Sequence, residues 1–403
     1  MSKKILIVTE YFYPEEFKIN EIALAWKEKG YDVDVLTQHP TYPLGKIYDG
    51  YENKWYTKDT YEGINIYRVK AVTGYRESKF KKLLKYFTFM FLGSMISLKV
   101  GKKYDYVFGF DIAALTGMVP AILLKKFYNK PVTLWIQDVW PDSVYAYGFR
   151  KTKLLESSLN TFVKFVYKHT SHFAISSQGF KNRILPYLNN NQDIKYLPNW
   201  ADEFNRDLEA FAFSEEPRVH FTFSGNVGKV QNLENIIEAF GLLSDRDLQK
   251  AQLNIIGDGS HLQYLKKQVE KNNLQNIIFW GRQPRYEMYK YLKGSDFLIV
   301  SLVNKPIFSL TVPAKTQTYI AAGKPLLAII SGDVTDIVKD NNLGYCTQPD
   351  DTKDIKNTLV KCINTDKETI NSFTKNCKHL TNTTFNKEKI IDALLQLLIK
   401  EDK

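Results

Sequence analysis

Short β-branched apolar runs alternate with helical patterns through the first half of the chain. Such a run predicts a buried strand, and apolar residues spaced three and four apart predict one face of a helix. Strands are predicted at residues 4–8, 33–36, 64–69, 106–110, 132–136 and 172–175, with helices at 19–29 and 151–168. The alternation stops at residues 197–200, Leu-Pro-Asn-Trp, which indicates a linker.

The same alternation starts again beyond this linker. Strands are predicted at residues 219–224, 253–256, 277–280, 297–301 and 325–329, with a helix at 233–243. Two successive arrays of this kind predict an α/β fold with two Rossmann-like domains that face a cleft. We place the first domain at residues 1–198 and the second at 199–386. The last helix, within 387–403, is a candidate to pack back onto the first domain.

Residues 37–60 interrupt the alternation with a stretch that has no regular period. It holds two prolines, two glycines and four tyrosines. One interpretation is a surface loop that packs a few aromatic side chains. The other is a functional lid, because long loops at the end of a strand often carry function.

Charge is distributed unevenly along the chain of 403 residues, whose net charge is +11. Residues 1–200 contain 29 Lys and Arg against 18 Asp and Glu, whereas residues 201–403 contain 26 of each kind. An excess confined to the first half points to a polyanionic or acidic-membrane partner for that half. No recognition-helix, zinc-finger or RNA-binding signature accompanies the charge, so nucleic acid is not the expected partner.

Lysines stand beside large apolar residues in residues 76–103, RESKFKKLLKYFTFMFLGSMISLKVGKK. The lysines are Lys79, Lys81, Lys82 and Lys85. The apolar part, residues 86–98, is too short to span a bilayer and is interrupted by Gly93 and Ser94. The segment is either a helix with its apolar face on the sheet and its lysines in water, or a monotopic helix with its lysines on anionic headgroups. The density of aromatic residues favours the monotopic helix.

No targeting segment is recognised at the N-terminus, because the apolar run in MSKKILIVTEYF is short and leads directly into polar sequence. We therefore expect a cytoplasmic protein that is peripheral on the inner face of the cell membrane. Cys346, Cys362 and Cys377 form no metal spacing and no even set, so we expect them to be reduced.

The most informative stretch is residues 312–325, VPAKTQTYIAAGKP. It reads as a loop with Pro313, Ala314 and Lys315, followed by a short helix that ends at Gly323 and then by a strand. Such a βαβ crossover would bring the N–H groups of a helix N-terminus and the Lys315 ammonium to one place. That combination suits a diphosphate.

Two glycine-containing loops follow earlier strands of the same domain. The first consists of Gly225, Asn226, Gly228 and Lys229. Its glycines would let the backbone approach a phosphate, and Lys229 adds positive charge. Gly257 opens the second loop, where a plain turn is the main alternative. Arg282 follows the next strand, and its alternative role is a solvated surface cation.

The order and spacing of these pieces resemble the C-terminal domain of the retaining family-four glycosyltransferases. The pieces are FSGNVGK, NIIGDG, IIFWGRQPRYEMYKYLKGSDFLIVSL and VPAKTQTYIAAGKP. The opening KILIVTEYFYPEE and the linker YLPNWAD extend the resemblance over most of the chain. The segment DVWPDS at 138–143 is similar to that of bacterial L-fucosamine (N-acetyl-L-fucosamine) transferases of O-antigen and capsule synthesis.

This resemblance implies a GT-B fold, a UDP-sugar donor in the C-terminal domain and an acceptor in the N-terminal domain. It also implies retention at the anomeric carbon with no metal or other cofactor. Carried onto the matching positions, Lys229 and Lys315 bind the diphosphate, and Arg282 lies beside the strand end that holds the base. The donor sugar would be an N-acetylated deoxyhexose such as L-FucNAc, and the acceptor would be linked to a polyprenyl diphosphate.

Fixed cations and helix N-termini can stabilise a departing nucleoside diphosphate in place of Mg²⁺. No Asp-x-Asp pair follows a predicted strand at its carboxyl end, because Asp32-Val33-Asp34 lies at the start of one. A metal-free mechanism is therefore the favoured interpretation.

The chain departs from the family at two glutamates, seven residues apart, that hold the donor sugar and the ribose. Their positions fall on Leu310 and Thr318 here. Thr318 offers a single hydroxyl, and a donor sugar with fewer hydroxyl groups is one way to accommodate the loss.

The family's histidine after the fifth strand is also missing, and Gln137 and Asp138 stand there. Asp138 is the best catalytic candidate, as a base or charge stabiliser for the acceptor, and a helix cap is its alternative role. Glu16, with its neighbour Glu15, either serves the acceptor or caps the helix that begins near residue 19. His39 follows a strand end and is a further catalytic candidate.

Three other functions are considered. A nucleotide-sugar epimerase of the same fold would need carboxylates and a histidine in the cleft and no membrane contact. A non-catalytic sugar-nucleotide-binding subunit is consistent with the missing glutamates. An oxidoreductase is disfavoured, because no G-x-G-x-x-G follows the first strand.

Overall fold

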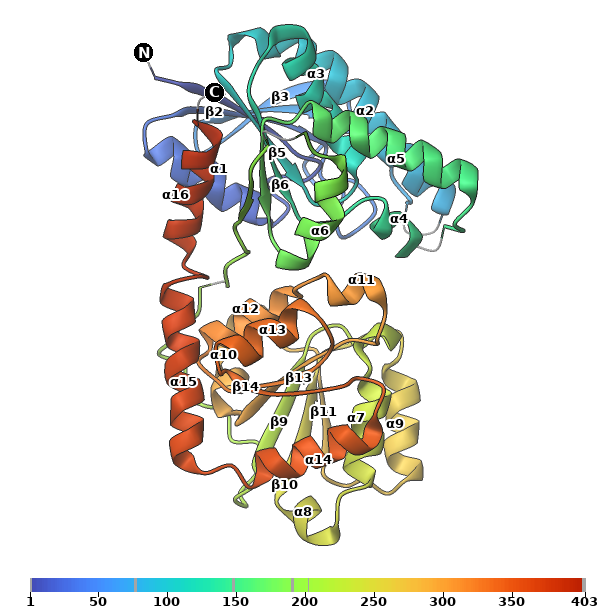
Figure 1. Ribbon diagram of the computed structural model, residues 1–403, viewed down its shortest axis with the longest axis vertical. Coiled ribbons are helices and arrows are strands. Elements are labelled where there is room, and N and C mark those ends of the chain that lie inside the picture. The colour runs from blue at the N-terminus through green and yellow to red at the C-terminus, as the bar shows by residue number, and fades with distance from the viewer. Residues whose placement is uncertain (1, 76–77, 147–148, 190–191, 202, 401–403) are drawn as a thin grey trace. The chain divides into compact units, whose positions relative to one another are not determined.

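The computed structural model describes residues 2–75, 78–146, 149–189, 192–201 and 203–400 (Figure 1). The chain divides into two compact units. Unit 1 comprises Met1–Leu197 with Glu388–Lys403, and unit 2 comprises Pro198–Lys387. Each unit contains its own sheet with helices packed against it. The predicted α/β fold with two Rossmann-like sheets is confirmed.

Unit 1 is built on an eight-stranded sheet with the order β3-β4-β2-β1-β5-β6-β7-β8. The strands are β1 (Lys4–Val8), β2 (Asp32–Gln38), β3 (Tyr56–Tyr61), β4 (Ile64–Val69), β5 (Tyr106–Asp111), β6 (Val132–Ile136), β7 (His172–Ile175) and β8 (Ile194–Tyr196). All neighbours pair in parallel except β3 and β4. The chain runs outward from β1 to one side and from β5 to the other. The strand order therefore reverses between β1 and β5, which is where parallel α/β sheets bind ligands.

Helices cover this sheet because their apolar residues fall on one side. They are α1 (Lys18–Glu28), α2 (Lys79–Val100), α3 (Val119–Tyr128), α4 (Asp142–Ala146), α5 (Lys153–Lys168), α6 (Lys181–Ile184) and α16 (Lys387–Leu398). In α1 the buried residues include Ile19, Ile22 and Trp26, at the three- and four-residue spacing of a single helix face. Gly30, with φ of +90°, follows this helix and lets the chain turn into β2.

Strand β3 begins inside the 37–60 segment, in which the sequence showed no regular period, and ends one residue beyond it. Its sequence, YTKDTY, pairs antiparallel with β4 at the edge of the sheet, and its side chains are half-buried or exposed. An edge strand of this kind needs no apolar run, because it is not buried on both faces. The prediction of an irregular segment was therefore wrong for residues 56–60.

Unit 2 is built on a six-stranded sheet with the order β11-β10-β9-β12-β13-β14, in which all neighbours pair in parallel. The strands are β9 (Val219–Ser224), β10 (Ala251–Ile256), β11 (Ile277–Gly281), β12 (Phe297–Ser301), β13 (Leu326–Ile329) and β14 (Gly344–Thr347). The helices are α7 (Leu233–Gly241), α8 (Asp245–Gln249), α9 (Leu262–Lys271), α10 (Met288–Gly294), α11 (Pro306–Ser309), α12 (Ala314–Ala321), α13 (Asp333–Asp340), α14 (Thr352–Ile363) and α15 (Lys367–Asn382). Here the strand order reverses between β9 and β12.

Strand β12 shows why the strands of this sheet read as continuous apolar runs. Phe297 and Ile299 pack into the core on one face of the sheet, and Leu298 and Val300 pack into the core on the other. Both faces are covered by helices, so every position of the strand is buried and apolar.

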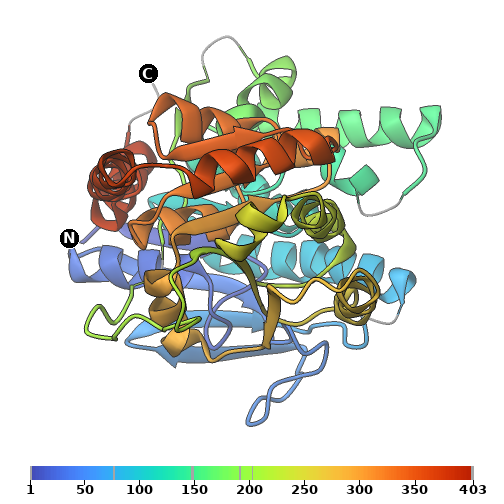
Figure 2. The same ribbon diagram turned by 90° about the horizontal axis from the view of Figure 1, so that it is seen from below.

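The last helix, α16, returns to unit 1 and lies along α1 (Figure 1 and Figure 2). The indole Nε1 of Trp26 donates to the carbonyl of Ile391 at 3.3 Å, and Lys29 pairs with Asp392 at 2.9 Å. The end of the chain is thus part of the first unit.

Candidate functional site

Two loops are joined at the carboxyl ends of β9 and β10 in unit 2. The N–H of Gly225 donates to Ile256 O at 2.9 Å, and the N–H of Val227 donates to Asp258 O at 2.9 Å. Gly257 has φ of +138°, and a Cβ there would lie 1.9 Å from Gly225 O. Only glycine fits this position, so Gly257 is more than a plain turn residue.

Lys315 reaches these loops from the first turn of α12, not from the loop where the sequence placed it. Its Nζ lies 3.7 Å from the ring centroid of Phe223 and 3.4 Å from Gln231 Oε1. A Cβ on Gly225 would lie 3.3 Å from the same nitrogen. The side chain is partly buried, and desolvation lowers the pKa of its ammonium to about 7.

The surroundings of Lys315 leave its charge without compensation. No ion pair among the described residues includes this lysine, and its hydrogen-bond partner Gln231 is neutral. A desolvated cation with only neutral neighbours is unfavourable until an anion joins it. The arrangement therefore fits an anionic ligand beside the start of α12.

Tyr319 holds α12 against β9 and so positions Lys315. Its hydroxyl accepts from Ser224 N at 2.9 Å and donates to Ser224 O at 3.2 Å. Thr318, the position of the missing glutamate, donates its hydroxyl to Ala314 O at 3.1 Å within the helix. The Thr318 hydroxyl is therefore already used by the backbone.

The structure brings Gly225, Gly257 and Lys315 together. Gly228 is buried in the same loop, and Pro313 is the N-cap residue of α12. Four other predicted donor residues are exposed: Asn226, Lys229 and Arg282 in the segments that follow β9 and β11, and Ala314 at the first position of α12. Arg282 follows β11, one strand further out than β10, directly after Gly281, whose carbonyl accepts from Gly257 N at 2.8 Å.

Unit 1 has buried carboxyl groups at the corresponding edge of its sheet. Glu10 follows β1, Asp111 ends β5 and Asp138 follows β6. Glu10 is 2% exposed and Asp111 is 1% exposed. Within the described part of the chain, none of the four carboxyl oxygens of Glu10 and Asp111 has a hydrogen-bond partner.

Burial is the main cause of the raised pKa values of these three carboxyl groups. It raises the pKa of Glu10 to about 7, an effect that Lys85 opposes, and it raises the pKa of Asp138 to about 7. Burial raises the pKa of Asp111 well above its usual range, and Asp138 and Glu10 add to the rise. Proton-holding carboxyls of this kind can bind hydroxyl groups or exchange protons with them.

Lys85 is part of this buried region. It is 1% exposed, and its Nζ lies 2.7 Å from the hydroxyl of Tyr11. Burial lowers its pKa, and Glu10 and Glu15 raise it. The prediction that Lys85 stands with the other lysines at the surface was therefore wrong, because its side chain points into the unit.

Neither Glu15 nor Glu16 is the N-cap residue of α1, which is Phe17, and the Phe17 side chain makes no capping hydrogen bond. Glu15 is buried and accepts from the N–H groups of Thr41 and Tyr42 at 2.8 and 2.6 Å. It therefore anchors the loop after β2. Glu16 is exposed.

His39 is buried at the end of β2, three strands away from Asp138 in the order β2-β1-β5-β6. Three strand spacings are about 14 Å. Its ring Nε2 lies 3.1 Å from the carbonyl oxygen of Lys54. The structure thus places His39 with the 40–55 loop and not beside Asp138.

Known proteins similar to this chain include glycosyltransferases. Residues 205–380 match the family model of the glycosyl transferases group 1. WbjE of Pseudomonas aeruginosa, a probable glycosyltransferase, is 28% identical over 254 residues, which cover 59% of this chain and 62% of WbjE. WcaI of Escherichia coli K12, named for glycosyl transfer in colanic acid biosynthesis, is 23% identical over 343 residues, which cover 79% of this chain and 81% of WcaI. This chain is a glycosyltransferase whose residues 205–380 match group 1.

The transferase has the same fold as several proteins of known structure. Sucrose-phosphate synthase from Thermosynechococcus elongatus has a TM-score of 0.70 at 14% identity and covers 98% of both chains. HepE of Anabaena, in complex with UDP and glucose, has a TM-score of 0.64 at 12% identity with the same coverage. The predicted GT-B fold and the predicted class of enzyme are confirmed.

Helix α2 of the transferase contains most of the basic aromatic segment. It is continuous through Gly93 and Ser94, and by length and composition alone Phe80–Lys103 is long and apolar enough to cross a membrane. The prediction of an interrupted segment too short to span a bilayer was therefore wrong. Only 28% of its most apolar window is buried inside the fold.

One side of α2 exposes large apolar side chains. Its inner face includes Phe89 and Leu92, which are buried. The exposed apolar residues recur at helical spacing and are Phe80, Leu83, Leu84, Phe87, Phe91 and Met95. Such an apolar stripe is typical of a contact surface.

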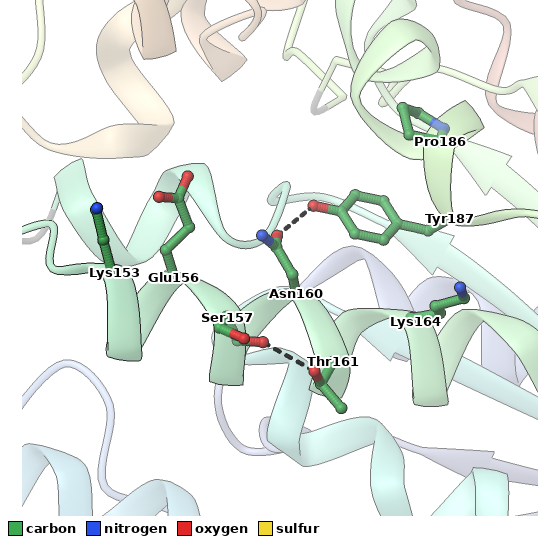
Figure 3. Close-up of a pocket in the computed structure, with 8 residues that line it drawn as sticks. All are labelled: Lys153, Glu156, Ser157, Asn160, Thr161, Lys164, Pro186 and Tyr187. Atoms are coloured by element: carbon green, nitrogen blue, oxygen red, sulfur yellow. Dashed lines mark hydrogen bonds between the residues drawn. The ribbon is translucent and has the colours of Figure 1, made fainter.

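A cavity of about 580 Å³ opens between α5 and the turn Leu185–Tyr187 of the transferase (Figure 3). The hydroxyl of Tyr187 donates to Asn160 Oδ1 at 2.6 Å across it. None of the residues predicted as catalytic or donor-binding lines this cavity.

Sequence reasoning missed Glu10, Asp111, Phe223, Gln231 and Tyr319. Glu10 stands just after the apolar run in KILIVTE, and Asp111 ends the run VFGFD. An acidic residue at the end of such a run lies at the carboxyl end of a strand, and this position could have identified both. Phe223 read as an ordinary strand residue and Tyr319 as an ordinary helix residue. Their contacts with Lys315 and Ser224 join segments about a hundred residues apart.

Proposed function

We propose that this transferase moves a sugar from a UDP-sugar to a lipid-diphosphate-linked saccharide, with retention at the anomeric carbon and without a metal. The observation that carries the proposal is the Lys315 ammonium. It is desolvated, faces an aromatic ring and has one neutral hydrogen-bond partner. The diphosphate of a nucleotide sugar would supply the anion that this cation lacks.

The proposed chemistry depends on how negative charge develops. When the bond from the anomeric carbon to the diphosphate breaks, its electron pair goes to the leaving phosphate oxygen. Lys315, the N–H groups at the start of α12 and the glycine loops of Gly225 and Gly257 would stabilise that oxygen. The acceptor hydroxyl oxygen forms the new bond, and we assign Asp138 to orient that hydroxyl and receive its proton.

For the donor we propose UDP with an N-acetylated deoxyhexose such as L-FucNAc. HepE, which shares the fold, has been solved in complex with UDP-glucose. The Thr318 hydroxyl is bonded to Ala314 O, so this position offers no carboxylate to a sugar hydroxyl. A deoxy sugar presents fewer hydroxyl groups to be recognised.

For the acceptor we propose a polyprenyl-diphosphate-linked saccharide of surface polysaccharide synthesis, reached at the inner face of the cell membrane. WcaI is named for the biosynthesis of colanic acid. The apolar stripe of α2 would enter the lipid interface, and basic residues of the same helix, such as Lys81 and Lys82, would meet anionic headgroups.

Thermal shift with a panel of UDP- and GDP-sugars tests the donor assignment, because a ligand that binds the folded state raises the apparent melting temperature. We expect a rise with UDP-sugars and none with GDP-sugars. Incubation of labelled UDP-sugar without acceptor is the companion assay. Accumulation of an epimer there would identify an epimerase and overturn the proposal. Binding without turnover on any lipid-linked acceptor would identify a non-catalytic subunit.

A further inference from the structure

The cavity between α5 and the turn Leu185–Tyr187, called the α5 cavity from here on, contributes no residue to the proposed reaction. Its volume of about 580 Å³ lies in the range of small-molecule sites, about 300 to 1,000 Å³. One wall is the face of α5 from Lys153 to Lys164, which extends about 16 Å along the helix axis. Pro186 and Tyr187 form the opposite wall (Figure 3). The α5 cavity is therefore longer than a single sugar ring.

The middle of α5 presents neutral hydrogen-bonding groups to this cavity. Asn160 Oδ1 accepts from the hydroxyl of Tyr187 at 2.6 Å, which orients the amide and leaves its Nδ2 as a donor. Nδ2 has no acceptor among the described residues and is not one of the enclosed polar atoms, so a ligand can reach it. Ser157 is exposed, and the hydroxyl of Thr161, which donates to Ser157 O at 2.9 Å, can still accept.

The charged side chains of the lining have both signs. Lys153 and Lys164 are exposed, and neither forms an ion pair with a described residue. Glu156 stands between them on the helix and pairs with Lys151, which is not part of the lining, at 2.8 Å. A ligand of a single charge would be repelled by one of these groups. Hydroxyl groups can accept from the ammonium groups and donate to the carboxylate, so the lining favours a neutral polyhydroxyl ligand.

The opposite wall adds apolar ring surface. Tyr187 is half-buried and Pro186 is exposed, and both line the cavity. The C–H face of a pyranose packs on an aromatic ring, while its hydroxyls both donate and accept. Ring surface beside an amide, hydroxyls and mixed charges is thus suited to a saccharide.

The α5 cavity adjoins the segment that contains Asp138. Asp142 begins α4, four residues after Asp138, and pairs with Arg183 of α6 at 3.8 Å. Tyr187 follows Arg183 by about one helical turn. A saccharide in the cavity would therefore lie beside the loop to which we assign the acceptor hydroxyl.

We propose that the α5 cavity binds a neutral oligosaccharide, the part of the acceptor glycan beyond the sugar that reacts. Asn160 and the charged residues of α5 contact its hydroxyls, and Tyr187 contacts its apolar face. Its place in the acceptor rests on the proposed function, whereas binding of a free oligosaccharide does not.

Saturation-transfer NMR on the full-length protein tests the proposal. Chitotetraose and maltotetraose are the neutral probes, methyl N-acetylglucosaminide is the single-sugar probe, and a hyaluronan tetrasaccharide is the acidic probe. We expect transfer to at least one neutral tetrasaccharide and weaker transfer to the single sugar, because the cavity is longer than one ring.

Two neighbouring serines of α5 provide a matched pair of variants. Ser157→Trp would fill the cavity from an exposed position, so binding of the neutral tetrasaccharide should weaken at least about tenfold. Ser158 is exposed on the same helix but does not line the cavity, and Ser158→Trp should stay within about twofold of wild type. Asn160→Asp keeps the acceptor for Tyr187 and removes the Nδ2 donor, so it should weaken binding about tenfold.

Three outcomes would overturn the proposal: no transfer to either neutral tetrasaccharide, equal binding by Ser157→Trp and Ser158→Trp, or binding of the acidic tetrasaccharide alone. UDP titration of the same samples keeps the two proposals apart. Normal UDP affinity without oligosaccharide binding would reject only the α5 cavity. Oligosaccharide binding without UDP binding would reject only the proposed donor chemistry.

Discussion

In unit 2 the desolvated ammonium of Lys315 lies where the strand order reverses between β9 and β12. In unit 1 the buried carboxyl groups of Glu10 and Asp111 lie where the order reverses between β1 and β5. Both units use the same topological position. Lys315 has no acidic partner among the described residues, while Glu10 and Asp111 hold four carboxyl oxygens without hydrogen bonds there. The fold thus determines where a ligand binds, and the side chains at that edge determine its chemistry. An anion suits unit 2, and hydroxyl groups suit unit 1.

The largest expected effect is on the contact of the two loops in unit 2. Gly257→Ala would place a Cβ 1.9 Å from Gly225 O at φ of +138°, so we expect the free energy of unfolding to fall by about 3 kcal/mol in urea titrations. Gly281→Ala is the matched control, because its φ is +67° and nothing lies within 4 Å of the added Cβ. The control should lose about 1 kcal/mol. Equal losses would mean that the loop contact does not constrain Gly257.

Removing the Lys315 ammonium should weaken the binding of an anionic ligand to unit 2. We expect Lys315→Ala to weaken UDP binding about 10- to 100-fold in calorimetry, because a charge-assisted hydrogen bond is lost. Lys229→Ala removes an exposed lysine near the same strand ends, and its loss should stay within about fivefold. A larger loss for Lys229 than for Lys315 would contradict the assignment of the anion site.

The two units should respond to different ranges of pH. Burial raises the pKa of Glu10 to about 7, so between about pH 4.5 and 7 the native state holds a proton that the unfolded state releases. Stability from this group is present at low pH and is lost as pH rises through 7. Relative to wild type, Glu10→Gln should therefore gain about 3 kcal/mol between pH 4 and pH 8, measured by denaturation curves at both pH values. Glu16→Gln, which changes an exposed glutamate, is the control variant.

Lys315 gives the opposite sign in unit 2. Its folded pKa of about 7 lies below the usual 10.5, so the unfolded state binds the extra proton between these values. Stability should rise with pH through that window in wild type and remain flat in Lys315→Met. A rise that persists in the variant would show that another group causes it.

The smallest expected effect concerns the partner surface of unit 1. Phe87→Ser with Phe91→Ser removes two residues of the α2 stripe that are 47% and 64% exposed. We expect about tenfold weaker sedimentation with phosphatidylglycerol vesicles, because less apolar surface enters the lipid. Tyr286→Ser, which changes a 76% exposed residue of unit 2, should leave vesicle binding unchanged. Equal binding by all three proteins would reject α2 as the membrane contact.

The strands of the fold were readable because most of them are buried on both faces. Strands such as β1 and β12 appear in the sequence as apolar runs with few competing interpretations. The edge strand β3 was missed, because YTKDTY has no apolar run and pairs only with β4. The continuity of α2 was also missed, because Gly93 looks like a helix breaker until it packs against Pro120.

By itself the sequence determined the two βα arrays, the order of the glycine loops and the presence of Lys315 before Gly323, because these features depend on residues close together in the chain. Only the tertiary structure decided that Lys315 lies against Phe223, that Glu10 and Asp111 are buried without partners, and that Lys85 points inward. The physical reason is desolvation. The state of an ionisable group depends on which distant segments exclude water from it, and local sequence patterns do not contain that information.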